Sequence, residues 1–383
     1  MEYFQTFIDG IGLTKMTIAD TIMLIVSLVL MYLAIVKKCE PFLLVPLSFG
    51  MMIANIPLAG LDAYTGPSIK DGITEPGGLI YYLYQGMKLS IWPPLIFLCL
   101  GAMTDFGPLI ARPSSAIIGI GGQLGIFVAF GLALLFNFDN GTAASIGIIG
   151  SSDGPTTIYT VIRLAPDMLA PVAIAAYSYM ALIPIIQPPI MRLLTTQKER
   201  VIVMPTPQDV SKRKRVIFPI AMTLATLLIV PAAGPLIAML MLGNLIKEAG
   251  VVDRFLPTLQ KPLLNIFTML IGISVGATAI GEKFLQPTTL IIICLGLIAF
   301  AFGTAGGVLM AKLLNVISGG KVNPLIGNSG VSAMPMAARV SQKLGQQYNP
   351  QNHLMMHAMG PIVASTLGSA IVAGIFITIF RGG

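Results

Sequence analysis

The side chains best suited to chemistry gather in one short polar stretch of an otherwise apolar sequence. Residues 150–155 read Gly-Ser-Ser-Asp-Gly-Pro and lie between two long apolar runs, 116–136 and 168–194. Pro155 lacks an N–H, and the neighbouring glycines loosen the backbone, so the stretch predicts a broken helix. At membrane depth such a break must be surrounded by protein or water, and the Asp153 carboxylate needs a partner. These residues predict a functional site inside the membrane; the alternative is an ordinary loop outside it.

A second polar cluster of the same kind lies near the C-terminus. Residues 323–342 read NPLIGNSGVSAMPMAARVSQ, in which 327–330 take the place of 150–153. Together the two clusters offer many neutral oxygens and a single carboxylate. That set suits a monovalent cation, because a dedicated Ca²⁺ site would have more carboxylates. We therefore expect sodium or a proton, with candidate oxygens on Ser151, Ser152, Asp153, Thr156, Asn323, Asn328, Ser329 and Ser332.

Three further sets of side chains have two interpretations each. Arg339, in a run of small residues, either reaches the lipid headgroups or holds a carboxylate or a planar polar ring through paired hydrogen bonds. Tyr177 and Tyr179 lie in an apolar helix, where packing is the usual role and proton donation the alternative. His353 and His357 have a zinc-like spacing, but no third ligand is evident, so we expect no zinc site.

The composition is that of a polytopic all-α membrane protein. Of 383 residues, 55% are hydrophobic and only 10% are charged, and the mean hydropathy is +0.85; soluble domains have about 25% charged residues. The net charge of +7 is concentrated in 195–215, which predicts a cytoplasmic loop and not a nucleic-acid-binding surface. No phosphate-binding loop or biotin-attachment sequence is present. If the chain uses chemical energy, a partner subunit must deliver the reactive group.

The order of apolar runs predicts two halves of similar design. A retained first helix at 18–36 precedes them, and 216–242 is expected to be one span followed by a polar connection at 243–261. Each half has about five elements, and an odd number inverts the second half relative to the first. The two broken or re-entrant helices would then meet near the bilayer midplane. The expected units are 1–40 (N-terminal helix), 41–196 (first inverted repeat), 197–215 (basic cytoplasmic linker) and 216–383 (second inverted repeat).

Three motifs resemble one known family along nearly the whole chain. They are GSSDGPTTIY (150–159), AYSYMALIPIIQPPIMRLLTT (176–196) and NPLIGNSGVSAMPMAARVSQ (323–342). They are similar to the membrane beta subunit of the sodium-pumping, biotin-dependent decarboxylases, which include oxaloacetate, methylmalonyl-CoA and glutaconyl-CoA decarboxylases. The resemblance implies a multi-pass subunit of the cell (inner) membrane that decarboxylates carboxybiotin and couples this to outward Na⁺ transport and proton consumption. The alternative is a secondary Na⁺- or H⁺-coupled carrier of the same architecture.

The resemblance also implies roles for particular residues. Asp153, Asn323 and Ser332 would bind sodium, and Asp153 would also take part in catalysis. Tyr179 would lie on the proton or ion path as a catalytic residue. Arg339 would hold carboxybiotin, with Gly327 allowing close approach of the backbone.

One departure concerns the last helix. Residues 359–363 read Met-Gly-Pro-Ile-Val, where the family usually has Asn in place of Ile362. This puts the number of ions per turnover in doubt.

The implied partners are a biotin-carrying carboxyltransferase alpha subunit, a small gamma or delta membrane subunit and the lipid bilayer, with a homo-oligomer as a further candidate. The acid or acyl-CoA that is decarboxylated would be chosen by the absent alpha subunit.

Overall fold

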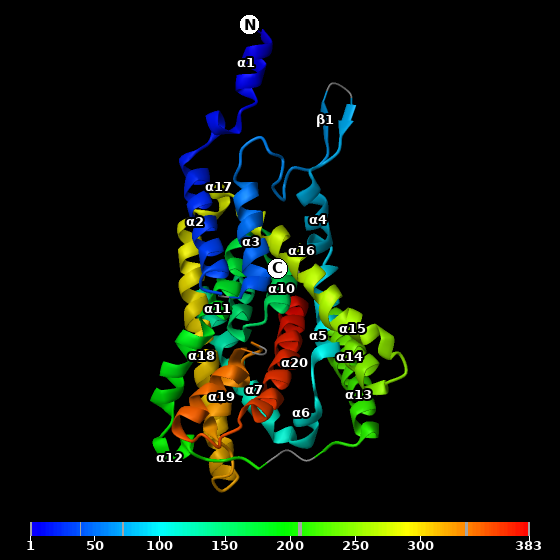
Figure 1. The fold of residues 1–383 in the computed structure, drawn as a ribbon, viewed down its shortest axis with the longest axis vertical. Helices are drawn as coiled ribbons and strands as arrows, with labels where there is room; N and C mark the ends of the chain where they lie inside the picture. Colours follow the sequence, from blue (N-terminus) through cyan, green and yellow to red (C-terminus); the bar gives the residue numbers. More distant parts are fainter. Residues whose placement is uncertain (1, 39, 71–72, 206–208, 334–335, 382–383) are drawn as a thin grey trace.

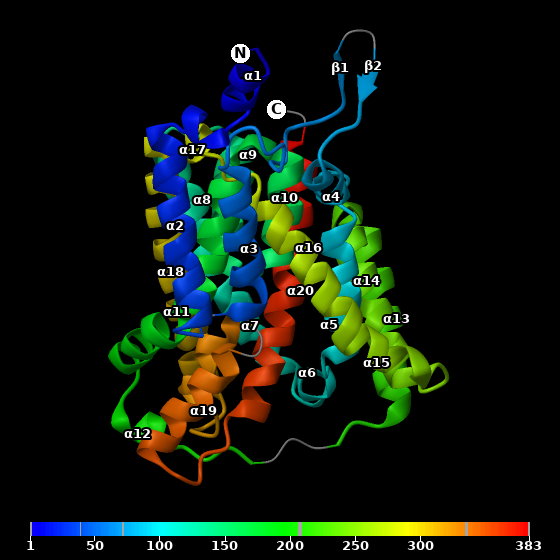
Figure 2. The ribbon, with the colours of Figure 1, turned by 45° about the horizontal axis from the view of Figure 1, so that its top comes forward.

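The protein is a bundle of helices with one small β-hairpin at one end. The computed structural model describes residues 2–38, 40–70, 73–205, 209–333 and 336–381. Strands β1 (Ser68–Lys70) and β2 (Ile73–Glu75) pair antiparallel. Figures 1 and 2 show α1 and this hairpin at one end of the bundle, with α12 and α19 at the other.

The helices alternate between long apolar rods and short connecting turns. In the first half they are α1 (Glu2–Asp9), η1 (Gly12–Lys15), α2 (Ile18–Ile35), α3 (Pro41–Ala54), α4 (Leu79–Lys88), α5 (Trp92–Met103), α6 (Gly107–Ala111), η2 (Pro113–Ser115), α7 (Ala116–Gly122), α8 (Leu124–Leu135), α9 (Asn140–Gly147), η3 (Ile148–Ser151), α10 (Gly154–Leu164), η4 (Pro166–Met168), α11 (Leu169–Leu194) and α12 (Gln197–Arg200). In the second half they are α13 (Lys212–Ile229), η5 (Pro231–Ala233), α14 (Gly234–Ala249), η6 (Asp253–Phe255), α15 (Leu256–Thr258), η7 (Leu259–Leu263), α16 (Leu264–Gly276), α17 (Gly281–Phe284), α18 (Pro287–Ile317), η8 (Pro324–Gly330), α19 (Met336–Tyr348) and α20 (Met355–Phe380).

The long helices confirm a multi-pass membrane protein. Within the described residues, six helices are long and apolar enough to cross a bilayer, and the count rises to eight if each of two bent helix pairs is one span. A crossing needs about 20 apolar residues, which these helices provide. The expectation of an all-α polytopic fold is confirmed at this level.

One expected span is wrong. Residues 216–242 form parts of two helices, α13 and α14, which pack against each other. Pro231 disfavours the helical conformation in the residue before it, and Val230 leaves it with ψ 77°. The polar connection expected at 243–261 is also wrong at its start, because α14 continues to Ala249 and ends at Gly250 in the left-handed conformation (φ +65°). A hydropathy average does not detect the turn between α13 and α14, because all of its residues are apolar.

The region 60–88 contributes a helix to the bundle, because α4 packs against α16. α4 meets α5 at an angle of 68°, and the two together are apolar enough for one broken span. The bend is fixed by Trp92, whose indole N–H donates a hydrogen bond to the Leu83 carbonyl at 3.0 Å. Its ring lies directly against Gly86, where no side chain would fit.

Glycines set the closest helix contacts. α5 packs on α14, and α3 packs on α16. A methyl group at Gly101 would lie 1.9 Å from the Leu240 carbonyl oxygen, and one at Gly243 would lie 2.0 Å from that of Leu98. In membranes, small residues of this kind let helix backbones approach and gain dispersion contacts.

The two interrupted segments are hairpins. In the first, α9 and α10 pack together, and Gly141 at its start lies against Leu164 at its end. Ser152 makes the turn in the left-handed conformation (φ 55°). In the second, the Ser341 hydroxyl on α19 donates to the Leu325 carbonyl on η8 at 3.3 Å. Each segment therefore begins and ends on the same side of the bundle.

The glycine contacts give a stability prediction. Gly101→Ala should destabilise the protein by roughly 1–3 kcal/mol, because the new methyl group meets backbone that cannot turn aside. Gly131→Ala on α8 is the matched control: nothing lies within 4 Å of its added methyl group, and alanine favours a helix by about 0.5–1 kcal/mol. Thermal unfolding in detergent measures both, and equal effects would contradict the packing argument.

Candidate functional site

The tips of the two hairpins touch each other. The Ser332 N–H donates a hydrogen bond to the Ser151 carbonyl at 2.9 Å. The Ser332 hydroxyl donates to the Ser365 hydroxyl on α20 at 3.1 Å. The structure thus joins two polar clusters that are about 180 residues apart in the sequence, and it adds one face of α20 to them.

Asp153 lies at this junction as the N-cap of α10. Its side chain is only 5% exposed. One carboxylate oxygen accepts from the Thr156 N–H at 3.2 Å and the other from the Ser369 hydroxyl at 3.0 Å. None of the ion pairs found among the described residues includes Asp153. A buried carboxylate without a cationic partner is strongly destabilising, so this position calls for a cation or a proton.

Two neighbouring side-chain oxygens are buried without a well-formed hydrogen bond. They are the hydroxyl of Thr156, beside the Asp153 carboxylate, and the amide oxygen of Gln123 between α7 and α8. The Gln123 amide nitrogen donates to the hydroxyl of Ser365 at 3.1 Å and to its carbonyl at 3.3 Å. Buried polar groups are rarely left unpaired, and an exception is often explained by an ion. A carboxylate with hydroxyl, amide and carbonyl oxygens is a donor set that fits sodium.

The predicted residues separate into two places. Asp153 and Ser332 come together, since they bond to Ser369 and Ser365, which lie on successive turns of α20. Asn323 lies with the linker instead. Its amide nitrogen donates to the carbonyls of Arg200 at 3.1 Å and Ile202 at 2.8 Å, and its amide oxygen accepts from the Leu325 N–H.

The two tyrosines of α11 have different neighbours. The Tyr179 hydroxyl donates to the Ile293 carbonyl of α18, and its ring packs on Gly296. The Tyr177 ring packs directly on Gly154, the residue after Asp153. Tyr177 is therefore the tyrosine closest in packing to the carboxylate.

Arg339 and Gly327 lie on the second hairpin. Arg339 is exposed on α19, with Glu40, at the start of α3, as a nearby charge. Gly327 faces α18 so closely that a methyl group there would lie 2.4 Å from the Val308 Cα. Ile362, the departure from the family pattern, is fully buried.

Sequence reasoning missed Gln123, Ser365 and Ser369. Each lies inside a strongly apolar run, where a hydropathy average hides it. One signal was available: Ser365 and Ser369 are four residues apart and so share a helix face.

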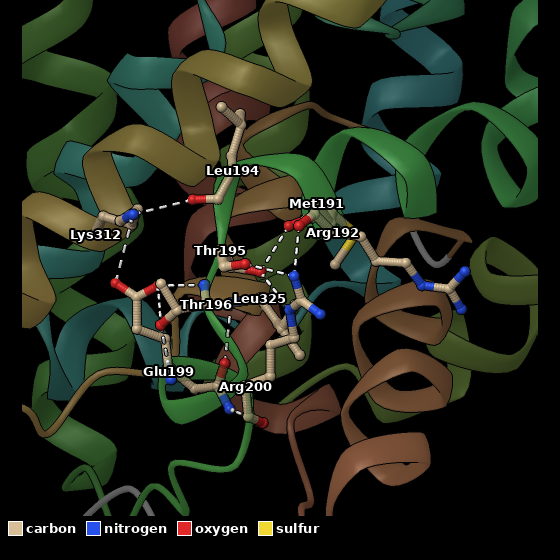
Figure 3. A network of polar contacts seen from close by, with 10 residues as sticks. Met191, Arg192, Leu194, Thr195, Thr196, Glu199, Arg200, Lys312 and Leu325 are labelled. Carbon is tan, nitrogen blue, oxygen red and sulfur yellow. Dashed lines mark hydrogen bonds and ion pairs between the residues drawn. The ribbon is translucent and has the colours of Figure 1, made fainter.

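The first part of the linker is fastened to the second hairpin (Figure 3). The buried Arg200 guanidinium donates to the Thr195 hydroxyl at 2.8 Å and to the carbonyls of Arg192 and Thr195, which end α11. It also donates to the Tyr348 hydroxyl at 2.8 Å. The Arg200 carbonyl accepts from Asn323, as described above. This arrangement connects the end of α11 to both ends of the second hairpin.

Glu199 and Lys312 add an ion pair beside this contact, with 3.6 Å between nitrogen and oxygen. Burial alone would raise the pKa of Glu199, but hydrogen bonds from the Thr196 N–H and hydroxyl, together with the Lys312 charge, lower the pKa below its ordinary value. Stability from such a group is present above its unfolded pKa of about 4.5 and is lost as the pH falls through the lower folded value.

This gives a pH prediction. In the unmodified protein, hydrogen exchange at the backbone amides of 196–202, corrected for intrinsic rates, should speed up as the pH falls below about 4.5. Glu199→Gln should remove most of that pH dependence and leave exchange faster throughout. Asp209→Asn, which removes an exposed carboxylate of the same linker, should leave the dependence intact. An unchanged profile in Glu199→Gln would show that the pair does not hold the linker.

Comparisons with known proteins show the family of this chain. A family model described as the Na⁺-transporting oxaloacetate decarboxylase beta subunit matches residues 19–380. The methylmalonyl-CoA decarboxylase beta subunit of Propionigenium modestum is 51% identical, over 99% of this chain and 100% of its own. The glutaconyl-CoA decarboxylase beta subunit of Acidaminococcus fermentans is 48% identical (98% and 97%). The oxaloacetate decarboxylase beta chain 2 of Salmonella typhi is 46% identical (98% and 99%). The chain belongs to the family of beta subunits of Na⁺-transporting decarboxylases.

Proposed function

We propose that this chain decarboxylates carboxybiotin delivered by a partner subunit and uses the free energy released to move Na⁺ outward, with consumption of a proton. The observation that carries the proposal is the buried Asp153 carboxylate at the junction of the two hairpin tips. It has no cationic side-chain partner among the described residues. The Thr156 hydroxyl lies beside it, and the Gln123 amide, whose oxygen has no hydrogen-bond partner, bonds to Ser365 one turn before Ser369. A transported cation would supply the missing positive charge.

Two inverted repeats with their hairpins meeting near the midplane would explain the arrangement. If α2 corresponds to α13, α3 to α14 and α5 to α16, then the α3–α16 contact is the counterpart of the α14–α5 contact. The α2–α3 contact likewise corresponds to α13–α14. Each repeat would then have five crossings and one re-entrant hairpin, and the odd number of crossings inverts the second. The N-terminal helix would belong to the first repeat instead of standing apart.

Coupling requires the ion site to open to one face at a time. Moving one charge against 100 mV takes about 2.3 kcal/mol, so outward transport needs a chemical source. Paired hairpins held by few direct bonds are a suitable two-state element. In this proposal Asp153 and Ser332 bind the ion with Thr156, Gln123 and Ser369. Asn323 would join them only after releasing the linker carbonyls.

The partners follow from the chemistry and from the relatives, whose names describe them as subunits or chains. A biotin-carrying carboxyltransferase alpha subunit would approach from the side of the basic linker, which the positive-inside rule places in the cytoplasm. Small gamma or delta chains are proposed as further partners. We propose that Tyr179 lies on the proton or ion path and that Gly327 allows close approach of the backbone.

The rival function, a secondary carrier, predicts that avidin leaves sodium transport by the purified complex unchanged.

The ion site can be tested on Asp153. Asp153→Asn should abolish sodium-dependent decarboxylation, and the protein should no longer be stabilised by NaCl over KCl in thermal unfolding. Ser369→Ala should raise the sodium requirement about tenfold, since a hydrogen bond to a charged group contributes about 1.5–3 kcal/mol. Ser145→Ala, a buried hydroxyl that bonds within α9, is the control and should change neither. Retained sodium dependence in Asp153→Asn would refute the site.

The proposed role of Arg339 has its own test. If the guanidinium holds carboxybiotin through paired hydrogen bonds, Arg339→Lys should raise the KM for carboxybiotin about tenfold or more, because lysine cannot form the planar pair. Arg192→Lys replaces an arginine of the same end that bonds to Gln347 and should leave KM unchanged. Full turnover of Arg339→Lys at unchanged KM would leave only a surface role for the residue.

A further inference from the structure

A pocket with a cationic rim lies at the linker end of the bundle, away from the ion site. It is bounded by the turn before α7, the linker, α18, η8 and the first turn of α20, and its cavity volume is about 30 Å³. Its polar lining consists of Arg112, Ser114, Ser115 and His357, while Ile118 and Ile326 are among its apolar walls. None of the roles described so far uses these polar side chains.

The polar groups suit an anion. The Arg112 guanidinium donates one hydrogen bond, to the Pro205 carbonyl at 3.2 Å, and it is in none of the ion pairs found among the described residues. His357 is 8% exposed, with its ring beside the Met204 backbone and the Arg112 charge. A guanidinium with free N–H groups, joined by the Ser114 hydroxyl, matches a planar oxyanion. The Ser115 hydroxyl is already used, because it donates to the Arg112 carbonyl at 2.7 Å.

We propose that this pocket binds a planar carboxylate-type anion, either the carboxyl group carried on biotin or free bicarbonate formed after decarboxylation. The proposal rests on the proposed function, because decarboxylation is what brings such an anion to this face. The space is narrow and the walls are apolar, which favours a small carboxylate over a phosphate ester or a nucleotide.

Three walls of the pocket continue into the ion site. Ile118 is on α7, after which Gln123 follows; Ile326 is on η8, which leads to Ser332. His357 is on α20, eight residues before Ser365, or about 12 Å at 1.5 Å per residue. An anion in the pocket therefore touches the three elements whose far ends hold the candidate sodium ligands. If the anion binds one arrangement of these three elements more tightly than another, its binding shifts the protein toward that arrangement.

Binding can be measured without turnover on the full chain in detergent. The probes are ¹³C-bicarbonate and formate, followed by NMR line broadening and isothermal titration. Arg112→Gln should weaken binding of both at least about tenfold, as expected for a lost charged hydrogen bond, and His357→Gln should weaken it less. Arg213→Gln removes an exposed arginine of the same end and should have no effect. If the wild type binds neither probe, or if Arg112→Gln and His357→Gln bind both as tightly as the wild type, the proposal is overturned.

Kinetics then identify the source of the carboxylate. If the pocket takes the carboxyl group on biotin, Arg112→Gln should raise the KM for free carboxybiotin about tenfold, and bicarbonate should compete. If it takes free bicarbonate, KM should stay the same and inhibition by bicarbonate should be lost. No change in either quantity would overturn the proposal. Probe binding does not depend on sodium or on catalysis, so it succeeds or fails separately from the sodium dependence that tests the proposed function.

Discussion

A buried negative charge without a positive side chain beside it governs this structure. Asp153 has hydrogen bonds from a backbone N–H and from Ser369, yet these cannot balance a full charge in a low-dielectric surrounding. The nearby unpaired oxygens of Thr156 and Gln123 add acceptors, not charge. A cation that comes and goes would make the protein's stability and its conformation depend on ion occupancy, which is what a pump needs.

Small residues make this junction possible. Two hairpin tips can meet only if the helices around them leave room for backbone, and Gly122 does so, since a methyl group there would lie 1.7 Å from the Gly330 carbonyl oxygen. Gly303 and Gly307 on α18 serve both hairpins in the same way.

The linker connects the end of α11 to the second hairpin. Arg200 holds the end of α11 and, through its carbonyl, the amide of Asn323 at the start of the second hairpin. A partner that binds the basic linker would therefore contact residues that hold Asn323, at the start of the hairpin strand that leads to Ser332. The pocket at Arg112 and His357 borders the same hairpin from another side.

The sequence alone determined the membrane class and the two interrupted segments, and it singled out Asp153 as a candidate, because charge, proline and glycine inside apolar runs are local signals. It also determined the family, through three long motifs. Only the tertiary structure decided which polar groups lie around the carboxylate. A backbone hydrogen bond to Ser151 brings Ser332 there, and Gln123 and Ser369 come from apolar runs far from Asp153 in the sequence. The division of 216–242 into two helices was likewise hidden, because hydropathy records burial in lipid but not the direction of the chain.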